Sequence, residues 1–454
     1  MHEHVGQPRP RSRQRTTAFA LLMAAVLLGL VVTGCGGSEG GTTAAAEKPP
    51  ANAKVEGTLE FWDAGTSTSV EEWWQEFIKE FEAKYPGAKV NMTTFSTEEF
   101  QTKYLAAFSS GGEPDVYETD TGELLERFVR VGKIADVSKL VDLKDFNPAS
   151  LKPVTDESGA VHGVPDYWFV MSMWENKDLF KKYGVKTPKT WDELLNACKT
   201  FSDAGVIPIT LGAAGQDQWT AVQWYDSLLY QYTGKAVGVD ATYGRNGAKW
   251  TDPEFVEAGE RFRELIDAKC FPDGFTGLSY QQMSTAFISG EAAMNFTGSW
   301  FASEIAAGKP DFEVGVFPLP DGPGAKYSTE ELDGVMGGVS VIAATQKGVD
   351  ENPALVSAFL EEFGKRVDDY ANAGEQLSVA VKPHPEGGQL QTALTKMLHS
   401  VGELVTFTGL VTPSAMINPT YENTSALIQG EATPEEFAER MQEVSERERP
   451  NFPK

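Results

Sequence analysis

The chain has 454 residues, 41% of them hydrophobic, and a formal net charge of −26 at pH 7. This length suits two domains better than one. A strongly acidic surface repels nucleic acid and anionic lipid headgroups, so the composition argues against both as partners.

The N-terminal segment has the layout of a secretory signal. Four arginines precede an apolar run over 18–32, which is too short for a stable transmembrane helix, and small residues follow it. Cys35 comes directly after Gly34 and resembles the cysteine of the bacterial lipobox, whose thiol receives a diacylglycerol. We therefore expect a lipoprotein signal peptide over 1–34 and lipidation at Cys35; an ordinary cleaved signal is the alternative.

Residues 35–54 are rich in Gly, Ala, Thr and Pro and have almost no apolar bulk. Such a segment cannot offset the entropy lost on ordering. We interpret it as a flexible tether between the lipid and the folded part.

From residue 55 onward, strand-like and helical patterns alternate. The first helix is expected to begin at a capping box of Ser69 and Glu72. The alternation is typical of an α/β fold with a parallel sheet. The predicted elements are strands at 58–62, 89–95 and 114–117 and helices at 70–85 and 100–108.

Later segments repeat this pattern. A capping box at 190–193 predicts one more helix, and the segments 251–254 and 433–436 predict two further helix starts, each with proline in the first turn. Residues 206–210 predict a strand. Residues 413–423 are rich in Pro and Asn and are expected to form a loop before the terminal helices.

Cys198 and Cys270 are left over once Cys35 is assigned to the lipid. Outside the cytoplasm such a pair is permitted to oxidise, so a disulfide and two buried free thiols both stay open. No Cys/His cluster has the spacing of a zinc site, and no metal is expected.

The sequence lacks the common catalytic motifs: it has no P-loop, no dinucleotide fingerprint and no HExxH. One Gly-x-Ser-x-Gly match, at 36–40, lies in the tether with no strand before it or helix after it. We therefore predict no catalytic residue and no cofactor. A secreted carbohydrate-cleaving enzyme stays open as a rival, because glycoside hydrolysis needs only two carboxylates at the right separation.

Several tryptophans lie in polar, loop-like contexts, Trp168, Trp219 and Trp300 among them. Flat aromatic surfaces cover the C–H face of a sugar ring, while carboxylates and amides hydrogen-bond its hydroxyls. These segments offer both kinds of group, which favours sugar binding; core packing is the alternative for each tryptophan.

Further segments match one known family in order and spacing. They are FIKEFEAKYPGAKV at 77–90, GGEPDV at 111–116, HGVP at 162–165, WENKDLF at 174–180 and AFISGEAAMNFTGSW at 286–300. The chain resembles the extracellular solute-binding proteins of ABC importers, in the large sugar-binding group that includes maltose-binding proteins. The resemblance implies a two-lobed, hinge-linked periplasmic-binding-protein-like fold (type II).

In such a fold the ligand lies between the lobes, in the crevice at the carboxyl ends of the strands. By this resemblance the N-lobe is 55–168 plus 339–382, and the C-lobe is 169–338 plus 383–454. The chain would cross between them near 168–172, 337–340 and 381–385, and the glycine pair at 337–338 would absorb hinge rotation.

The candidate ligand contacts are loop residues at strand ends and residues near the crossings, and Trp300 occupies the stacking position of the family motif. From the N-lobe they are Thr66, Ser67, Glu118 and Asp120; near the hinge, Asp166, Tyr167 and Trp168; from the C-lobe, Gln218, Trp219, Trp300, Asn418 and Tyr421.

The expected function is capture of a sugar or oligosaccharide by hinge closure and its presentation to the importer's membrane subunits. The protein would be a monomer, anchored by lipid to the outer face of a bacterial cell membrane, and not an enzyme. A receptor for another small solute, such as a polyamine drawn to Glu118 and Asp120, is the second possibility.

Overall fold

The computed structural model describes residues 47–50, 52–64, 67–95, 97–235, 237–328, 335–382, 388–399, 404–408 and 412–452. The predicted signal peptide, Cys35, most of the tether and Thr66 lie outside these ranges. Among the helices of the described ranges, none combines the length and the apolar character that crossing a bilayer requires.

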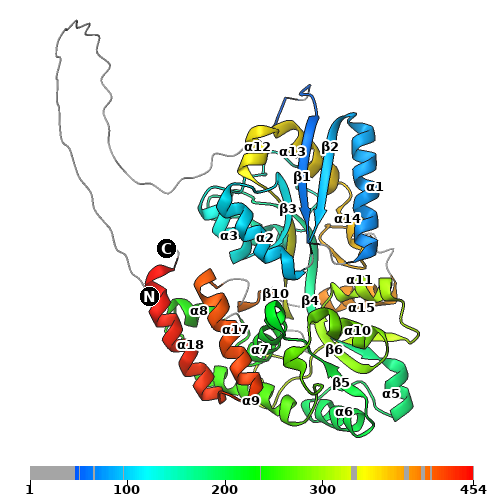
Figure 1. Cartoon of the computed structure of the whole chain (residues 1–454), viewed down its shortest axis with the longest axis vertical. Helices are drawn as coiled ribbons and strands as arrows, with labels where there is room; N and C mark the ends of the chain where they lie inside the picture. The colour runs from blue at the N-terminus through cyan, green and yellow to red at the C-terminus, as the bar shows by residue number, and fades with distance from the viewer. Residues whose placement is uncertain are drawn as a thin grey trace, which may run out of the picture. The chain divides into compact units, whose positions relative to one another are not determined.

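The strands follow the order β2-β1-β3-β8-β4-β6-β5, with β7 and β9 also pairing with β4, and β10 with β8 (Figure 1). β1 is parallel to β2 and β3, whereas β8 is antiparallel to both β3 and β4. The predicted α/β class is confirmed, although the sheet is mixed rather than wholly parallel. The strands are β1 Glu56–Asp63, β2 Gly87–Thr94, β3 Val116–Asp120, β4 Val164–Asn176, β5 Ile207–Thr210, β6 Ala292–Gly298, β7 Val314–Phe317, β8 Val335–Ala344, β9 Leu377–Ser378 and β10 Leu404–Val405.

β4 belongs to two groups of strands. Its first half, Val164–Val170, pairs with β8, and its second half, Met171–Glu175, pairs with β6. All 13 of its residues are buried. A single strand therefore leads from the group β2-β1-β3-β8 to the group β6-β5, which lie above and below the middle of Figure 1.

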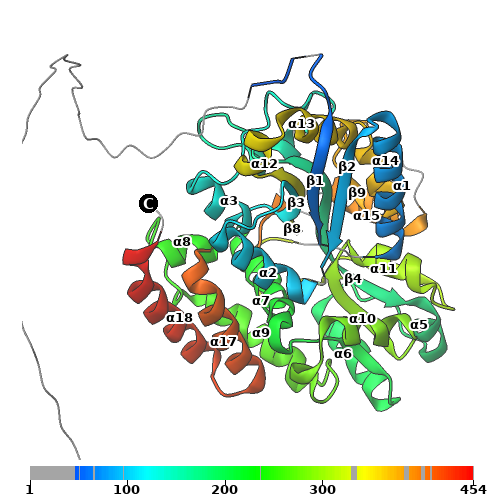
Figure 2. The same cartoon turned by 45° about the horizontal axis from the view of Figure 1, so that its top comes forward.

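Helices surround both strand groups. On the first group α1 packs against β2 and α14, and α13 packs against β1; on the second, α7, α9, α17 and α18 pack against one another (Figure 2). The helices are α1 Thr68–Lys84, α2 Thr97–Ser110, α3 Glu123–Arg130, α4 Pro148–Leu151, α5 Lys177–Tyr183, α6 Trp191–Asp203, α7 Trp219–Thr233, α8 Val237–Tyr243, α9 Pro253–Asp267, α10 Tyr280–Ile288, α11 Phe301–Gly308, α12 Gln346–Glu351, α13 Pro353–Gly364, α14 Val367–Ala373, α15 Gln389–His399, α17 Ser414–Gln429 and α18 Pro434–Glu448.

The α1 helix illustrates how the first core forms. Its apolar stripe buries Trp74 and Phe77, and the Trp74 ring lies 4.6 Å from Phe61 of β1 while Phe77 lies 5.4 Å from Phe359 of α13. Each such side chain contributes about 2–3 kcal/mol through removal from water. These contacts fix the end of β1, where the chain turns toward the cavity described below.

One predicted helix start is wrong, and three are confirmed. Ser67, not Ser69, caps α1, because its extended backbone lets its hydroxyl accept the Val70 N–H. Thr190 and Thr433 cap α6 and α18, and α9 begins at Pro253 after Asp252 in the N-cap position, within the predicted segment.

The predicted loop over 413–423 is also wrong, because α17 begins at Ser414 and includes Pro419. A proline inside a helix removes one hydrogen bond. Here the buried stripe that contains Met416 and Leu427 outweighs that loss, and Asn423 Nδ2 donates to the carbonyl of Pro419.

Cys198 of α6 and Cys270, which follows α9, form a disulfide. Both cysteines are fully buried. The backbone N–H of Ile209 in β5 donates to the carbonyl of Cys270, so the bond secures α6 beside the edge strand of the second group.

We expect the free energy of unfolding of the double variant Cys198→Ala/Cys270→Ala to be about 2–4 kcal/mol lower than that of the wild type. The reason is that the bond links residues 72 apart and so lowers the entropy of the unfolded wild-type chain. Urea titration measures the difference. Dithiothreitol should destabilise the wild type and leave the double variant unchanged; equal stability of the two proteins without reductant would contradict a native disulfide.

Candidate functional site

A cavity of about 880 Å³ lies between β3, β4 and β8 on one side and α7, α10, α11 and α17 on the other. This volume falls within the range of about 300–1,000 Å³ that is usual for small-molecule sites. Carboxylates lie at the end formed by β3 and β8, and aromatic side chains line the end formed by α7, α10 and α11.

The carboxylate end is built on β3. Glu118 and Asp120 line the cavity from within this strand, so their predicted position in a loop after it is wrong. The Ala64 N–H donates to Glu118 Oε2 at 3.3 Å, and the Ser340 hydroxyl lies 3.4 Å from Glu118 Oε1 and 3.2 Å from Asp166 Oδ2. Asp166 is fully buried behind this serine and does not line the cavity.

Burial dominates the electrostatics of this end. It raises the pKa of Glu118 well above its usual value, and the neighbouring charges of Asp63 and Asp166 raise it further. Burial also raises the pKa of Asp120 to about 6. Among the described residues that line this end of the cavity there is no lysine or arginine, so the acceptors offered here suit a solute rich in hydrogen-bond donors.

Three aromatic rings form one wall of the other end. The ring centroids of Trp219 and Tyr280 are 5.1 Å apart, and those of Trp219 and Trp300 are 6.1 Å apart. Asp217 positions two of them: its Oδ1 accepts from the Trp219 indole N–H at 3.3 Å, and its Oδ2 accepts from the Tyr280 backbone N–H at 2.8 Å. The wall is therefore held by buried hydrogen bonds as well as by packing.

A hydrogen-bonded chain leads away from Trp300. Its indole N–H donates to the Tyr280 hydroxyl oxygen at 2.9 Å, and that hydroxyl donates to Glu304 Oε1 at 2.5 Å. Burial raises the pKa of Glu304 to about 7, and hydrogen bonds from Tyr280 and Ser284 oppose that shift. A carboxyl group that titrates near neutrality is thus linked to Trp300 of the aromatic wall through one hydroxyl group, that of Tyr280.

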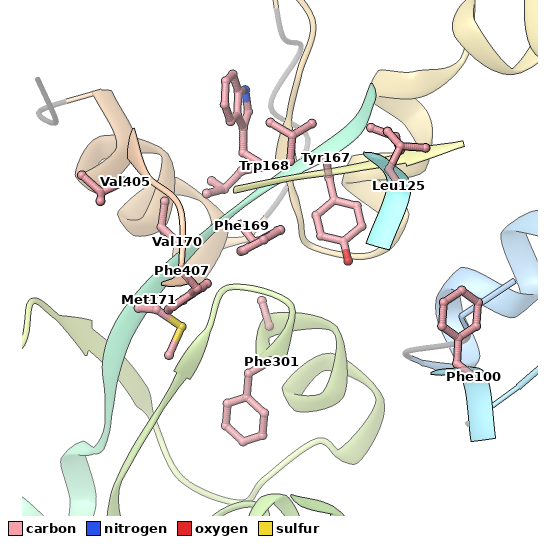
Figure 3. Packing of buried hydrophobic residues seen from close by; sticks show 14 of the residues in the cluster. Phe100, Leu125, Tyr167, Trp168, Phe169, Val170, Met171, Phe301, Val405 and Phe407 are labelled. Carbon is pink, nitrogen blue, oxygen red and sulfur yellow. The ribbon is translucent and has the colours of Figure 1, made fainter. Parts of the chain in front are cut away.

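The middle of the cavity is formed where β4 changes partners (Figure 3). Tyr167 and Phe169 project to one side of β4 and line the cavity, whereas Trp168 projects to the opposite side. Phe169 lies over Gly338 of β8, where a Cβ atom would come within 2.4 Å of its ring. Glycine at this position therefore lets the ring lie against the backbone.

Of the predicted ligand contacts, seven line the cavity: Ser67, Glu118, Asp120, Tyr167, Trp219, Trp300 and Tyr421. The structure places Asp166, Trp168, Gln218 and Asn418 outside this lining, and Thr66 is outside the described residues. Asn418 is exposed because the helix α17 turns Ile417 and Tyr421, four residues apart, toward the cavity instead. Burial raises the pKa of Tyr421 to about 12, so its hydroxyl stays protonated.

Sequence reasoning missed Tyr280, Glu304 and Asp217 as parts of this site. Glu304 did leave a signal, because it is the only charged residue in the helix FASEIAAG, which is apolar apart from Ser303. Among the described residues, no group of three or more His, Cys, Asp or Glu side chains is arranged to hold a metal ion.

Comparison with known proteins identifies the family. The profile of the bacterial extracellular solute-binding proteins matches residues 64–363. The chain belongs to this family. It has the two-lobed α/β fold of these proteins, and the cavity lies at the junction of its two strand groups.

Two curated relatives illustrate the family. An uncharacterized ABC transporter extracellular-binding protein of Pyrococcus horikoshii is 25% identical over 66% of this chain and 68% of its own length. A multiple sugar-binding protein of Streptococcus mutans is 28% identical over 54% of this chain and 58% of its own length.

Solved structures of the same fold cover most of the chain. A protein from work on xylan utilization by Caldanaerobius polysaccharolyticus has a TM-score of 0.77 at 24% identity, covering 85% of this chain and 99% of its own. A chitin oligosaccharide binding protein has a TM-score of 0.77 at 22% identity, covering 86% of this chain and 98% of its own.

Proposed function

We propose that this solute-binding protein captures a mono- or oligosaccharide between its two lobes and delivers it to an ABC importer. The observation that carries the proposal is the pairing, in one cavity, of the indole faces of Trp219 and Trp300 with the carboxylates of Glu118 and Asp120. An indole face suits the C–H surface of a sugar ring, and carboxylates are strong acceptors for its hydroxyls.

The relatives support the same class of solute. The Streptococcus mutans relative is named for binding multiple sugars, and structures of this fold include a chitin oligosaccharide binding protein and a maltose-bound protein of T. maritima. The cavity also has room for more than one ring, at about 880 Å³.

Capture would proceed by closure of the lobes around β4 and β8. We place the lobe boundaries near 168, 338 and 382, so that the N-lobe is 55–168 plus 339–382 and the C-lobe is 169–338 plus 383–454. The solute would bind one lobe first, and the second lobe would then add contacts and exclude water, so that differential affinity selects the closed form. Gly338 supports this hinge, because it has no side chain to obstruct rotation against Phe169.

The solute would leave unaltered. Glycoside hydrolysis needs one carboxyl group to protonate the leaving oxygen and another to act as base or nucleophile. Both oxygens of Glu118 already contact donors of the protein, Ala64 N–H and the Ser340 hydroxyl, which suits a rigid acceptor better than a proton-transfer group.

The test is a thermal-shift panel of maltotriose, xylotriose, chitotriose and spermidine, followed by X-ray scattering. A saccharide that binds only the native state should raise the melting temperature, and the same saccharide should reduce the radius of gyration. A shift with spermidine alone would replace the proposal by a receptor for cationic solutes. Cleavage products after incubation would replace it by an enzyme.

Trp300→Ala should weaken binding of the active saccharide by more than about 1 kcal/mol, which is roughly fivefold or more in Kd, because one stacked ring is lost. Isothermal titration calorimetry measures the change. Trp62→Ala is the matched control, since Trp62 is half-buried and outside the cavity lining. Equal affinities of Trp300→Ala and wild type would remove this ring from the site.

We also propose that a diacylglycerol on Cys35 holds the protein at the outer face of the cell membrane, near the importer, as a monomer. The support is the lipobox-like junction at Gly34–Cys35. Two acyl chains, at about 0.8 kcal/mol for each buried methylene, would make detachment negligible. Residues 35–54 would then act as the spacer between bilayer and fold.

Cys35→Ser should move the protein from the membrane fraction to the soluble fraction of a bacterial host that processes lipoproteins. Immunoblotting of the two fractions measures this. Ser38→Ala, a substitution of similar size in the same tether, should stay with the membranes. A Cys35→Ser protein that still sediments with membranes would exclude lipidation at this residue.

A further inference from the structure

We propose that Glu304, acting through Tyr280, is a positioning residue that orients the Trp300 indole and thereby makes solute affinity depend on pH. The inference rests on the proposed function for its effect on affinity, but the orienting contact itself is independent of any solute.

The geometry supports one direction of hydrogen bonding. The Trp300 indole N–H can only donate, so the Tyr280 oxygen must accept it, and the Tyr280 O–H is then directed to Glu304 Oε1. An ionised Glu304 can only accept, which fixes this polarity, and a charged acceptor strengthens the whole chain. A protonated Glu304 can instead donate to the Tyr280 oxygen and compete with the indole N–H.

The indole of Trp300 is closely packed by its neighbours. A Cβ atom on Gly298, at the end of β6, would lie 2.0 Å from the ring of Trp300. On other sides the ring contacts Trp219, at 6.1 Å between centroids, and Phe169, at 5.6 Å. The packing therefore fixes the plane of the ring, while the bond to Tyr280 fixes the direction of its N–H edge.

The ionised carboxyl group of Glu304 lowers the stability of the fold, so the need for a hydrogen-bond acceptor does not by itself explain why this residue is an acid. Burial raises the pKa of Glu304 to about 7, so its ionisation opposes folding above the pKa of the unfolded chain, and the penalty is complete above pH 7. Glutamine would make the same acceptor contact to Tyr280 without that penalty. A half-buried acid at the edge of a ligand cavity is therefore better explained by its effect on Trp300 than by stability.

Other titratable groups near Glu304 are few. α10 presents Tyr280, whose pKa burial raises well above its usual value, together with Ser284. α1, which packs against α11, has the exposed Glu71 in its first turn and the exposed Glu72 directly after it. Lys309 and Asp311 line the cavity beyond the end of α11.

Burial also raises the pKa of two other cavity carboxyl groups, that of Asp120 to about 6 and that of Glu118 well above its usual value. The variant Asp120→Asn distinguishes an effect of Asp120 titration from an effect of Glu304 titration.

The first experiment needs no solute. The indole ¹⁵N–¹H signal of Trp300, assigned with Trp300→Phe, is followed by NMR from pH 5.5 to 8.5. We expect it to shift with a midpoint near pH 7 in the wild type and in Asp120→Asn, and to stay constant in Glu304→Gln. A constant signal in the wild type, or an equal titration in Glu304→Gln, would overturn the proposal.

The second experiment measures calorimetric affinity for maltotriose, xylotriose and chitotriose at pH 6 and pH 8. For a saccharide that binds, the wild type should lose at least about threefold in affinity at pH 6, and Glu304→Gln should show no such loss. Tyr280→Phe, which removes the acceptor of the indole N–H, should bind more weakly at both values. An equal pH dependence in the wild type and Glu304→Gln would overturn the link to affinity.

The two experiments distinguish the possible failures. If none of the three saccharides binds, the proposed function fails for them while the NMR titration still tests the orienting contact. If they bind and the indole signal does not titrate, the proposed function stands and the role of Glu304 is overturned. Melting temperatures provide a check on folding: that of Glu304→Gln should exceed the wild-type value increasingly from pH 5 to about pH 7, and the difference should level off above it.

Discussion

The continuity of β4 is the constraint on which the site depends. Its first half pairs with β8 and its second half with β6, and all of its residues are buried. One strand therefore connects the group that carries the carboxylates of β3 to the group that carries the aromatic wall around α10 and α11. Tyr167 and Phe169 lie on the same face of β4 between these two groups, so the strand supplies the middle of the cavity as well as its frame.

Burial of acids at the β3–β8 end, where no lysine or arginine is found among the described lining residues, gives this part of the cavity its chemical character. Glu118 and Asp166 share contact with a single serine hydroxyl, Ser340, which has only one proton to donate. Burial raises the pKa of each acid, and the single serine proton leaves the oxygens that contact it short of donors. A solute that brings hydroxyl groups would supply the missing donors. These hydrogen bonds would stabilise the complex most once the second lobe has excluded water, which otherwise competes as a donor.

The sequence predicted elements well where the apolar pattern was long. The strand expected over 58–62 and the helix expected over 70–85 correspond to β1 and α1. The wide apolar stripe of 70–85 repeats at helical spacing over several turns, which excludes the two-residue alternation of a strand. It failed in α17, where Pro419 suggested a loop although buried residues continue on both sides of it. Local composition and tertiary packing conflict there, and packing prevails.

Site residues were harder to predict because single positions decide them. Trp168 and Tyr167 are adjacent, yet the alternation of a strand places only Tyr167 in the cavity. In the same way, one helical position separates exposed Asn418 from Ile417. The contact between Tyr280 and Glu304 joins residues 24 apart, and the chain returns through β6 to bring α10 and α11 together. The segment 280–304 thus folds as one unit, in which α10, β6 and α11 supply the hydroxyl, the glycine that admits the indole, and the carboxyl group that orients it.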